Sequence, residues 1–335
     1  MSPAIKRNVQ LDVIKGGLVL VMLVYHCISV SSFASLRVVL NHIQFIHTAF
    51  LVMFGFLCGY HYYPSARIEP VKIRKKLLTR AIKILIIFLG GNVFFHLLGF
   101  GQPGMARLQA IPIAQRMMEI LLKVPGDILA FEILYLIAVF MFVAAFIISF
   151  PFTKLITCAL ILLPMVASNK LIYYNAFGCT GMLIGILVQE RRLDGIARRF
   201  DRLLWLFPIL LAIRHVSIPD WESIIPFQSG RMMFILLETL LWFYSFLWAA
   251  RLLSRPWLNE QVVLFGAYTL PAYIMQMVLA RVTYVILNRA GFTNFSYCIF
   301  CVVIVMISTG VVVNGMDYLR RNWPVANRAY RLLFS

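Results

Sequence analysis

Long runs of hydrophobic residues, separated by short polar and basic stretches, follow one another along the whole chain. A membrane-spanning helix needs about 20 mostly apolar residues, and runs of about this length recur throughout. The pattern predicts ten membrane-spanning helices, at residues 11–31, 41–60, 79–99, 127–149, 152–168, 172–189, 203–218, 231–250, 262–287 and 295–315. No polar stretch is long enough for a soluble domain. We therefore expect an all-α, polytopic membrane protein with a single membrane-embedded domain over residues 1–335.

Composition points to the same class of protein. Hydrophobic residues make up 61% of the 335 residues, against roughly 45–50% in soluble domains. The first apolar run carries Asp12 and Lys15 and lacks a small-residue cleavage site. It is therefore expected to be a retained helix and not a signal peptide.

The basic residues predict the orientation of the helices. When both termini are placed in the cytoplasm, 20 of the 31 Lys and Arg residues fall in cytoplasmic segments and eight fall in outer loops. This asymmetry is what the positive-inside rule expects of an even number of spans. The net charge of +18 is then mostly a consequence of topology. Because the charge is divided among short loops, nucleic acid is not an expected partner.

The first apolar run carries three ionisable residues, Asp12, Lys15 and His26. Each costs about 2.5–3.5 kcal/mol near the centre of a bilayer, so each needs a structural or functional reason. In a helix with about 100° per residue, His26 returns to nearly the azimuth of Lys15, ~16 Å further along the axis. Asp12 lies one turn before Lys15. The helix therefore presents a carboxylate, an ammonium and an imidazole on one face.

This first helix reads Leu-Asp-x-x-Lys-Gly from Leu11, with ten residues between Lys15 and His26. In this it resembles the membrane acyltransferase-3 family, whose members acylate glycans and other acceptors across bacterial inner membranes. The resemblance extends to three further segments, which are Phe50–Tyr60, Arg80–Leu85 and Gly266–Gln276.

The chain also departs from the family pattern. Lys15 stands where Arg is commoner, Cys58 where Ser is usual, and Gln276 where a His is expected. The last departure puts a proton-transfer role at position 276 in doubt.

The resemblance implies an O-acyltransferase of the bacterial inner (cytoplasmic) membrane. The implied donor is acetyl-CoA or another short acyl-CoA, a succinyl donor included. The implied acceptor is a hydroxyl of a lipid-linked or exported glycan. Membrane lipids are the remaining expected partner.

Acyl transfer from a thioester to a hydroxyl needs a base that takes the hydroxyl proton. The unperturbed pKa of histidine lies near neutrality, so we interpret His26 as the base or as a transient acyl carrier. Lys15 is expected to orient the thioester or a phosphate, with Asp12 fixing its rotamer. An Asp12–Lys15 ion pair that only holds the helix in register explains both residues equally well.

A basic stretch on the cytoplasmic side is the candidate donor site. Its residues are Arg74, Lys75, Lys76, Arg80 and Lys83. The phosphates of coenzyme A need cationic partners of this kind. The alternatives are ordinary positive-inside bias and contact with anionic lipid headgroups.

Polar residues in other apolar runs are candidates for the acceptor site. Glu132, Tyr273 and Gln276 are the residues we assign to it, and Glu238 is a weaker candidate. Tyr273 and Gln276 are one turn apart and should share a face with Ala280. No metal cofactor is expected, because no Cys/His cluster or H-x-x-x-H pattern occurs. Cys298 and Cys301 are expected to pack in the apolar interior.

Two other classes of protein remain open. A proton-coupled transporter or lipid-linked glycan flippase would use Asp12, Lys15 and His26 as a proton relay. The sequence has no repeated half with matching Gly/Pro-broken segments, which many transporters show. A non-catalytic membrane scaffold is the third possibility.

Overall fold

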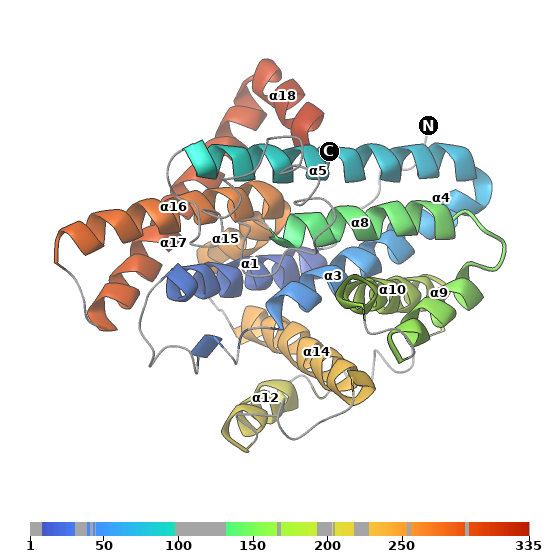
Figure 1. Ribbon diagram of the computed structural model, residues 1–335. Helices are drawn as coiled ribbons and strands as arrows, with labels where there is room; N and C mark the ends of the chain where they lie inside the picture. The colour runs from blue at the N-terminus through green and yellow to red at the C-terminus, as the bar shows by residue number, and fades with distance from the viewer. Residues whose placement is uncertain are drawn as a thin grey trace, which may run out of the picture. The chain divides into compact units, whose positions relative to one another are not determined.

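Helices make up nearly all of the chain that the computed structural model describes (Figure 1). The described residues are 9–30, 39–40, 43, 45–97, 132–165, 169–192, 203, 205–217, 228–252, 256–291 and 295–334, and no strand occurs among them. The helices are α1 (Val9–Val30), α3 (Ile46–Leu57), the π-helical turn η2 (Cys58–Tyr62), α4 (Tyr63–Ile68), α5 (Pro70–Leu97), α8 (Glu132–Ile147), α9 (Thr153–Leu162), the short 3-10 turn η3 (Leu163–Met165), α10 (Lys170–Gln189), α12 (Leu206–Ser217), α14 (Gln228–Leu252), α15 (Pro256–Ala267), α16 (Thr269–Arg289), α17 (Phe295–Asn322) and α18 (Pro324–Phe334).

Six of these helices are long and apolar enough to cross a membrane, namely α1, α5, α10, α14, α16 and α17. They indicate a multi-pass membrane protein, in which each span satisfies its own backbone hydrogen bonds. A helix also overlaps each of the four other predicted spans. All four of these helices are shorter, as described, than the ~20 residues of a full span, since α8 has 16 residues, α3 and α12 have 12 each and α9 has 10. The count of ten spans and the cytoplasmic placement of both termini therefore stay predictions.

The ninth predicted span, 262–287, is interrupted in the structure. α15 ends at Ala267 and α16 begins at Thr269, with Tyr268 between them at φ −109° and ψ 34°. Pro271 explains the break, because it has no N–H to donate to Ala267 and its ring clashes with that carbonyl group. The Thr269 hydroxyl donates instead to the Gly266 carbonyl at 2.7 Å.

Contacts among the described residues group them into two compact units. The single domain over residues 1–335 stays a prediction. The first unit contains α1, α12, α14 from Met233 on, and α15 to α18. Within it, α1 packs against α15, α16 and α17. At the α1–α15 contact the backbones lie close together. A Cβ on Gly16 would come within 2.0 Å of the Val262 carbonyl oxygen, so only glycine fits there.

The second unit contains α3 from His47 on, η2, α4, α5 and α8 to α10. Glycines line both sides of its contact between α3–η2 and α10. A Cβ on Gly55 would meet the Gly178 carbonyl oxygen at 1.9 Å, and one on Gly181 would meet the Val52 carbonyl oxygen at 2.0 Å. Gly59 and Gly185 make equivalent approaches one turn further along. This small-residue seam is the packing expected of helices in lipid, where close van der Waals contact replaces the hydrophobic driving force.

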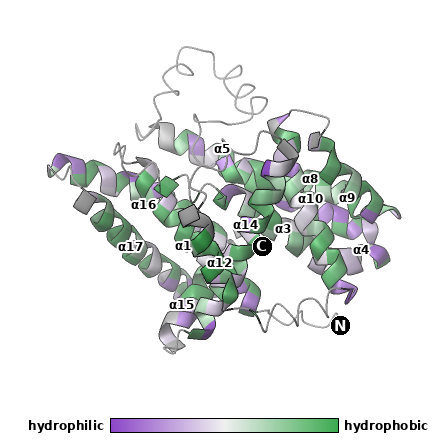
Figure 2. Ribbon diagram, turned by 90° about the horizontal axis from the view of Figure 1, so that it is seen from below, coloured by the Kyte–Doolittle hydropathy of each residue, from purple (hydrophilic) through white to green (hydrophobic). Residues whose placement is uncertain are grey.

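Many large apolar side chains remain exposed on the helices. On α17, Ile307 is 59% exposed and Val311 is 67% exposed, and Figure 2 shows hydrophobic residues along most of this helix. On a soluble protein such a surface would favour association. On α17, a candidate membrane span, it is the surface that we expect to face lipid.

Candidate functional site

Helix α1 carries the polar face that the sequence predicts. Asp12 is 5% exposed and His26 is 8% exposed, and Lys15 is half-buried between them along the helix. Apart from Gln10 and Ser29 near its ends and the Tyr25 hydroxyl, the rest of the helix is apolar, so the three ionisable side chains occur in a mostly hydrophobic surrounding. The two ends of this face have different surroundings.

At the first end, Asp12 and Lys15 form an ion pair. The Lys15 ammonium lies 2.5 Å from Asp12 Oδ1, and the side chains are 20% and 7% exposed, respectively. The ion pair considered at the sequence level is therefore confirmed. It lies in the tightest part of the α1–α15 contact, where a Cβ on Gly266 would come within 1.8 Å of the Asp12 carbonyl oxygen.

At the second end, His26 meets α16. The centroids of the His26 and Tyr273 rings are 5.7 Å apart, and the neighbouring Tyr25 ring packs edge-on at 5.5 Å. One turn along α16 from Tyr273 is Gln276, which is 0% exposed. Neither Gln276 Oε1 nor Nε2 has a hydrogen-bond partner among the residues that the structure describes. Buried amide groups almost always have such partners, so this one stands out.

The structure brings the helix of His26 together with the helix of Tyr273 and Gln276, a pair that the sequence predicts to share one face. His26 lies on α1, Tyr273 and Gln276 lie on α16, and the two helices pack against each other. The predicted shared face of α16 is confirmed, since Tyr273, Gln276 and Ala280 are all buried. We call His26, Tyr273 and Gln276 the His26 cluster.

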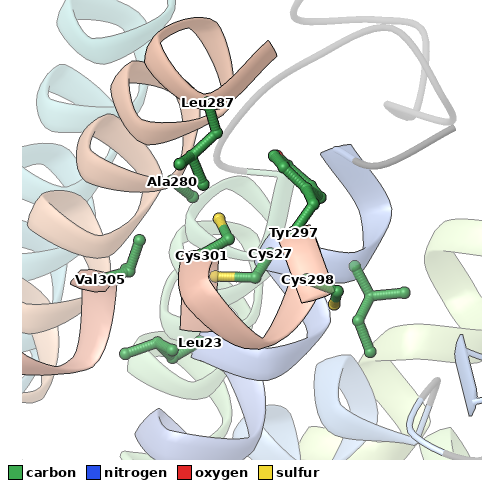
Figure 3. Packing of buried hydrophobic residues seen from close by; sticks show 9 residues of the cluster. Leu23, Cys27, Ala280, Leu287, Tyr297, Cys298, Cys301 and Val305 are labelled. Atoms are coloured by element: carbon green, nitrogen blue, oxygen red, sulfur yellow. The ribbon is translucent and has the colours of Figure 1, made fainter. Parts of the chain in front are cut away.

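An apolar layer adjoins the His26 cluster along α1 and α16. It contains Leu23, Cys27 and Ala280, together with Cys298 and Cys301 of α17. Figure 3 shows Cys27 and Cys301 side by side in this layer. All six cysteines of the chain are free thiols. The expected packing role of Cys298 and Cys301 is confirmed by their burial.

The chemical capacity of the His26 cluster follows from its groups. An imidazole accepts or donates a proton near neutral pH, a phenol donates or accepts a hydrogen bond, and an amide does both. A buried site with these groups suits proton transfer to or from a hydroxyl or carbonyl group.

The five predicted donor-site residues all lie on α5, in the second unit. Lys75 is exposed, and Lys83 is half-buried. The Arg74 guanidinium is exposed and lies 4.4 Å from the centroid of the Phe146 ring.

Arg80 and Lys76 turn towards η2. Arg80 donates a hydrogen bond to the Tyr62 hydroxyl, and the Lys76 ammonium lies 5.4 Å from the centroid of the same ring. Nearby, Arg67 donates to the Tyr63 hydroxyl at 2.6 Å. Three of the five basic residues, Arg74, Lys76 and Arg80, thus contact aromatic side chains. Arg74, Lys75 and Lys76 are the exposed ones.

Sequence reasoning missed Tyr62 and the π-helical turn in which it lies. Such turns are rare and frequently occur at functional sites. The signal available in the sequence was the spacing of Gly55 and Gly59, four residues apart, just before three tyrosines that precede a basic stretch.

The structure separates the predicted acceptor-site residues between the two units. Tyr273 and Gln276 lie in the first unit, whereas Glu132 is the half-buried first residue of α8 in the second. The weaker candidate, Glu238, is 3% exposed in α14 of the first unit.

A second network that the sequence did not reveal surrounds the break between α15 and α16. The Tyr268 hydroxyl donates to Asp317 Oδ1 at 2.8 Å, and Arg320 donates to the same hydroxyl at 3.4 Å. Asp317 also pairs with Arg321 at 2.7 Å. The network fastens the α15–α16 break to the last turns of α17.

Comparisons of the chain with protein-family models, with curated proteins and with solved structures find no match. The argument for a function therefore rests on the residues and their geometry.

Proposed function

We propose that this protein is a membrane O-acyltransferase. It would transfer a short acyl group, acetyl in the first instance, from acyl-CoA to a hydroxyl of a lipid-linked or exported glycan in the bacterial cytoplasmic membrane. The observation that carries the proposal is the His26 cluster, in which a buried imidazole packs near Tyr273 and the same helix carries Gln276, a buried amide with no hydrogen-bond partner in the part of the chain that the structure describes.

The proposed reaction uses His26 as the base. The imidazole takes the proton of the acceptor hydroxyl while the hydroxyl oxygen attacks the thioester carbonyl carbon. The carbon–sulfur bond then breaks, and the coenzyme A thiolate leaves and recovers the proton from the imidazolium. In the alternative route, the imidazole attacks the thioester carbonyl and displaces the coenzyme A thiolate, which forms an acyl-imidazole. The acceptor hydroxyl then attacks this acyl group, the imidazole is released, and the hydroxyl proton passes to the thiolate.

Tyr273 and Gln276 are the proposed acceptor-binding groups of this site. A hydrogen bond from a substrate hydroxyl or carbonyl would satisfy the Gln276 amide, which is 0% exposed. Burial of that amide without a partner costs free energy, and bound substrate would offset this cost. Glu132 stays a proposed acceptor-site residue on the basis of the sequence.

The donor is proposed to bind at α5. Arg74, Lys75 and Lys76 are exposed and carry no acidic neighbour within their own turn of the helix. Their charges suit the phosphates of coenzyme A. Arg80 and Lys83 continue the basic stretch, with Arg80 oriented by the Tyr62 hydroxyl.

Asp12 and Lys15 are proposed to support the site by holding α1 against α15. Their ion pair is nearly enclosed by the glycine contact between the two helices. A direct role of Lys15 towards the donor is a second proposal, supported by its 20% exposed side chain.

One observation favours the rival class, a proton-coupled transporter or lipid-linked glycan flippase. The break between α15 and α16 resembles the discontinuous helices that form ion and substrate sites in many transporters, and it lies against Asp12 through Gly266. In that function, Asp12, Lys15 and His26 would relay protons.

Thermal unfolding of the purified protein with and without acetyl-CoA tests the proposal first. A ligand at 100 times its Kd stabilises the folded state by about 2.7 kcal/mol, so Tm should rise by several degrees. The shift should disappear when Arg74, Lys75 and Lys76 are all replaced by Gln. The matched control replaces Arg289, Arg328 and Arg331 by Gln, since these three are also exposed, and should keep the shift.

Transfer of radiolabelled acetyl from acetyl-CoA to membrane glycans then tests the chemistry, with His26→Ala as the inactive variant. Absence of a Tm shift with any acyl-CoA, together with proton-coupled flux in proteoliposomes, would replace the acyltransferase by the transporter.

A further inference from the structure

The last helix, α18, has two unlike faces. It follows directly on α17, and from Tyr318 to Ser335 the sequence contains four arginines and no acidic residue. Because α17 is one of the candidate membrane spans, α18 begins where that span ends. A separate short helix in this position is visible in Figure 1.

The inner face of α18 is fastened to the first unit. The Arg320 guanidinium lies 4.7 Å from the centroid of the Tyr330 ring, and it donates from Nε to Asn327 Oδ1 at 3.4 Å. Tyr330 packs edge-on against Tyr268 with the ring centroids 5.4 Å apart. These contacts hold one side of α18 against the α15–α16 break.

The outer face carries exposed apolar side chains. Val325 is 77% exposed and Leu332 is 71% exposed, and these residues are seven positions apart, so they share one side of the helix. Trp323, just before the helix, is 61% exposed. The apolar outer residues lie on the side opposite to Tyr330 and Asn327, by the same helical spacing.

Positive charge borders this apolar strip. Arg328 and Arg331 are both exposed and lie between the apolar strip and the inner face. An apolar strip with arginines along one edge and a tryptophan beside it is typical of a helix that lies in the plane of a membrane interface. Tryptophan at the end of a span is likewise typical of the headgroup level.

We propose that the outer face of α18 lies on the membrane surface and binds anionic lipid headgroups. Val325 and Leu332 would enter the boundary between headgroups and acyl chains, and Arg328 and Arg331 would contact lipid phosphates. This inference is independent of acyl transfer and would hold equally for a transporter.

Fluorescence of the full-length protein in nanodiscs tests the proposal. A bimane probe is attached at Val325→Cys, in a protein whose exposed Cys158 is replaced by Ser, because the other cysteines are buried. The nanodiscs contain phosphatidylcholine alone or with about one quarter phosphatidylglycerol. We expect headgroup-level spin-labelled lipid to quench the probe about twofold more strongly in the anionic discs, with a shift of its emission to the blue.

Three further variants, one of them a control, distinguish the contribution of charge from that of apolar insertion. Arg328→Gln with Arg331→Gln should remove the dependence on phosphatidylglycerol, whereas the matched pair Lys72→Gln with Lys75→Gln on α5 should keep it. Leu332→Gln should weaken quenching in both kinds of disc. Size-exclusion profiles and Tm confirm that each variant is folded.

Three results would overturn the proposal. The first is a probe with the emission of a water-exposed group in both discs. The second is equal quenching with and without phosphatidylglycerol, which would leave insertion without anionic recognition. The third is a blue-shifted probe that no spin-labelled lipid quenches, which would mean that a protein segment or a second copy of the chain covers this face.

Discussion

The two ends of the polar face on α1 differ in how their buried polar groups are paired. At one end, Asp12 and Lys15 neutralise each other at 2.5 Å, and glycine allows α15 to close over them. At the other end, His26 contacts Tyr273 on α16, and Gln276, one turn further along α16, has neither polar atom of its buried amide bonded among the described residues.

This difference distinguishes buried polar groups that stabilise the fold from buried polar groups that are available to a ligand. A paired charge in a tight helix contact holds two elements together, and removing one partner leaves the other uncompensated. Burial of an amide with no partner lowers the stability of the fold. Its retention is understandable when a ligand supplies the missing hydrogen bonds. The Asp12–Lys15 ion pair thus resembles a structural contact between helices, and the His26 cluster resembles a binding site.

The largest expected effect is that of His26→Ala on acyl transfer. Loss of a general base lowers the rate by about 10²–10⁴-fold, while Tm should change little. Radiolabelled acetyl transfer and thermal unfolding measure the two quantities on the same preparation. His61→Gln, a half-buried histidine of η2, is the control and should keep its activity. A fall in Tm that accounts for the lost activity would make His26 structural and remove the contrast between the ends.

The next effect is that of Gly266→Ala on folding. The new Cβ would be 1.8 Å from the Asp12 carbonyl oxygen, a backbone atom that cannot turn aside. We expect the free energy of unfolding to fall by about 1–3 kcal/mol or more, seen as a lower Tm. Gly315→Ala is the matched control, because nothing lies within 4 Å of its added Cβ, and it should be neutral or slightly stabilising. Equal Tm values for the two variants would contradict the close α1–α15 contact.

A double-mutant cycle on Asp12 and Lys15 tests directly whether their ion pair holds α1 against α15. Asp12→Asn and Lys15→Met should each lower the free energy of unfolding by about 1–2 kcal/mol, because each leaves a mostly buried charge without its partner. The double variant should recover part of this loss. If its acyl transfer recovers as well, the pair is structural. Loss of transfer in a fully stable double variant would instead support the role of Lys15 towards the donor.

The smallest expected effect on stability is that of Gln276→Leu. Replacing an unbonded buried amide with an apolar side chain should leave the free energy of unfolding unchanged or raise it by up to about 1 kcal/mol. Acyl transfer should fall about tenfold, the value of one lost hydrogen bond to substrate. Met277→Leu, at the next and also buried position, is the control for volume alone. A marked loss of Tm in Gln276→Leu would show that the amide is engaged within the fold.

The membrane class and the polar face of α1 could be predicted because both are local. Runs of apolar residues set helix length, and a fixed rotation per residue places Asp12, Lys15 and His26 on one side. A helix overlaps each predicted span for the same reason. The number of membrane-spanning helices was harder to predict from the sequence, because several apolar runs form helices that, as described, are too short to cross a bilayer unaided.

The partners of each polar residue were decided by the tertiary structure alone. The sequence selected His26 and Gln276 but could not place them on facing helices, since they are 250 positions apart. It likewise selected Arg80 without Tyr62, and Lys15 without the glycine contact that encloses it. Hydropathy and helical spacing depend on neighbouring residues, whereas burial and pairing depend on which helices pack together. For this protein, the sequence determined which groups are in the membrane, and the packing of α1 against α15 and α16 decided which of them are satisfied.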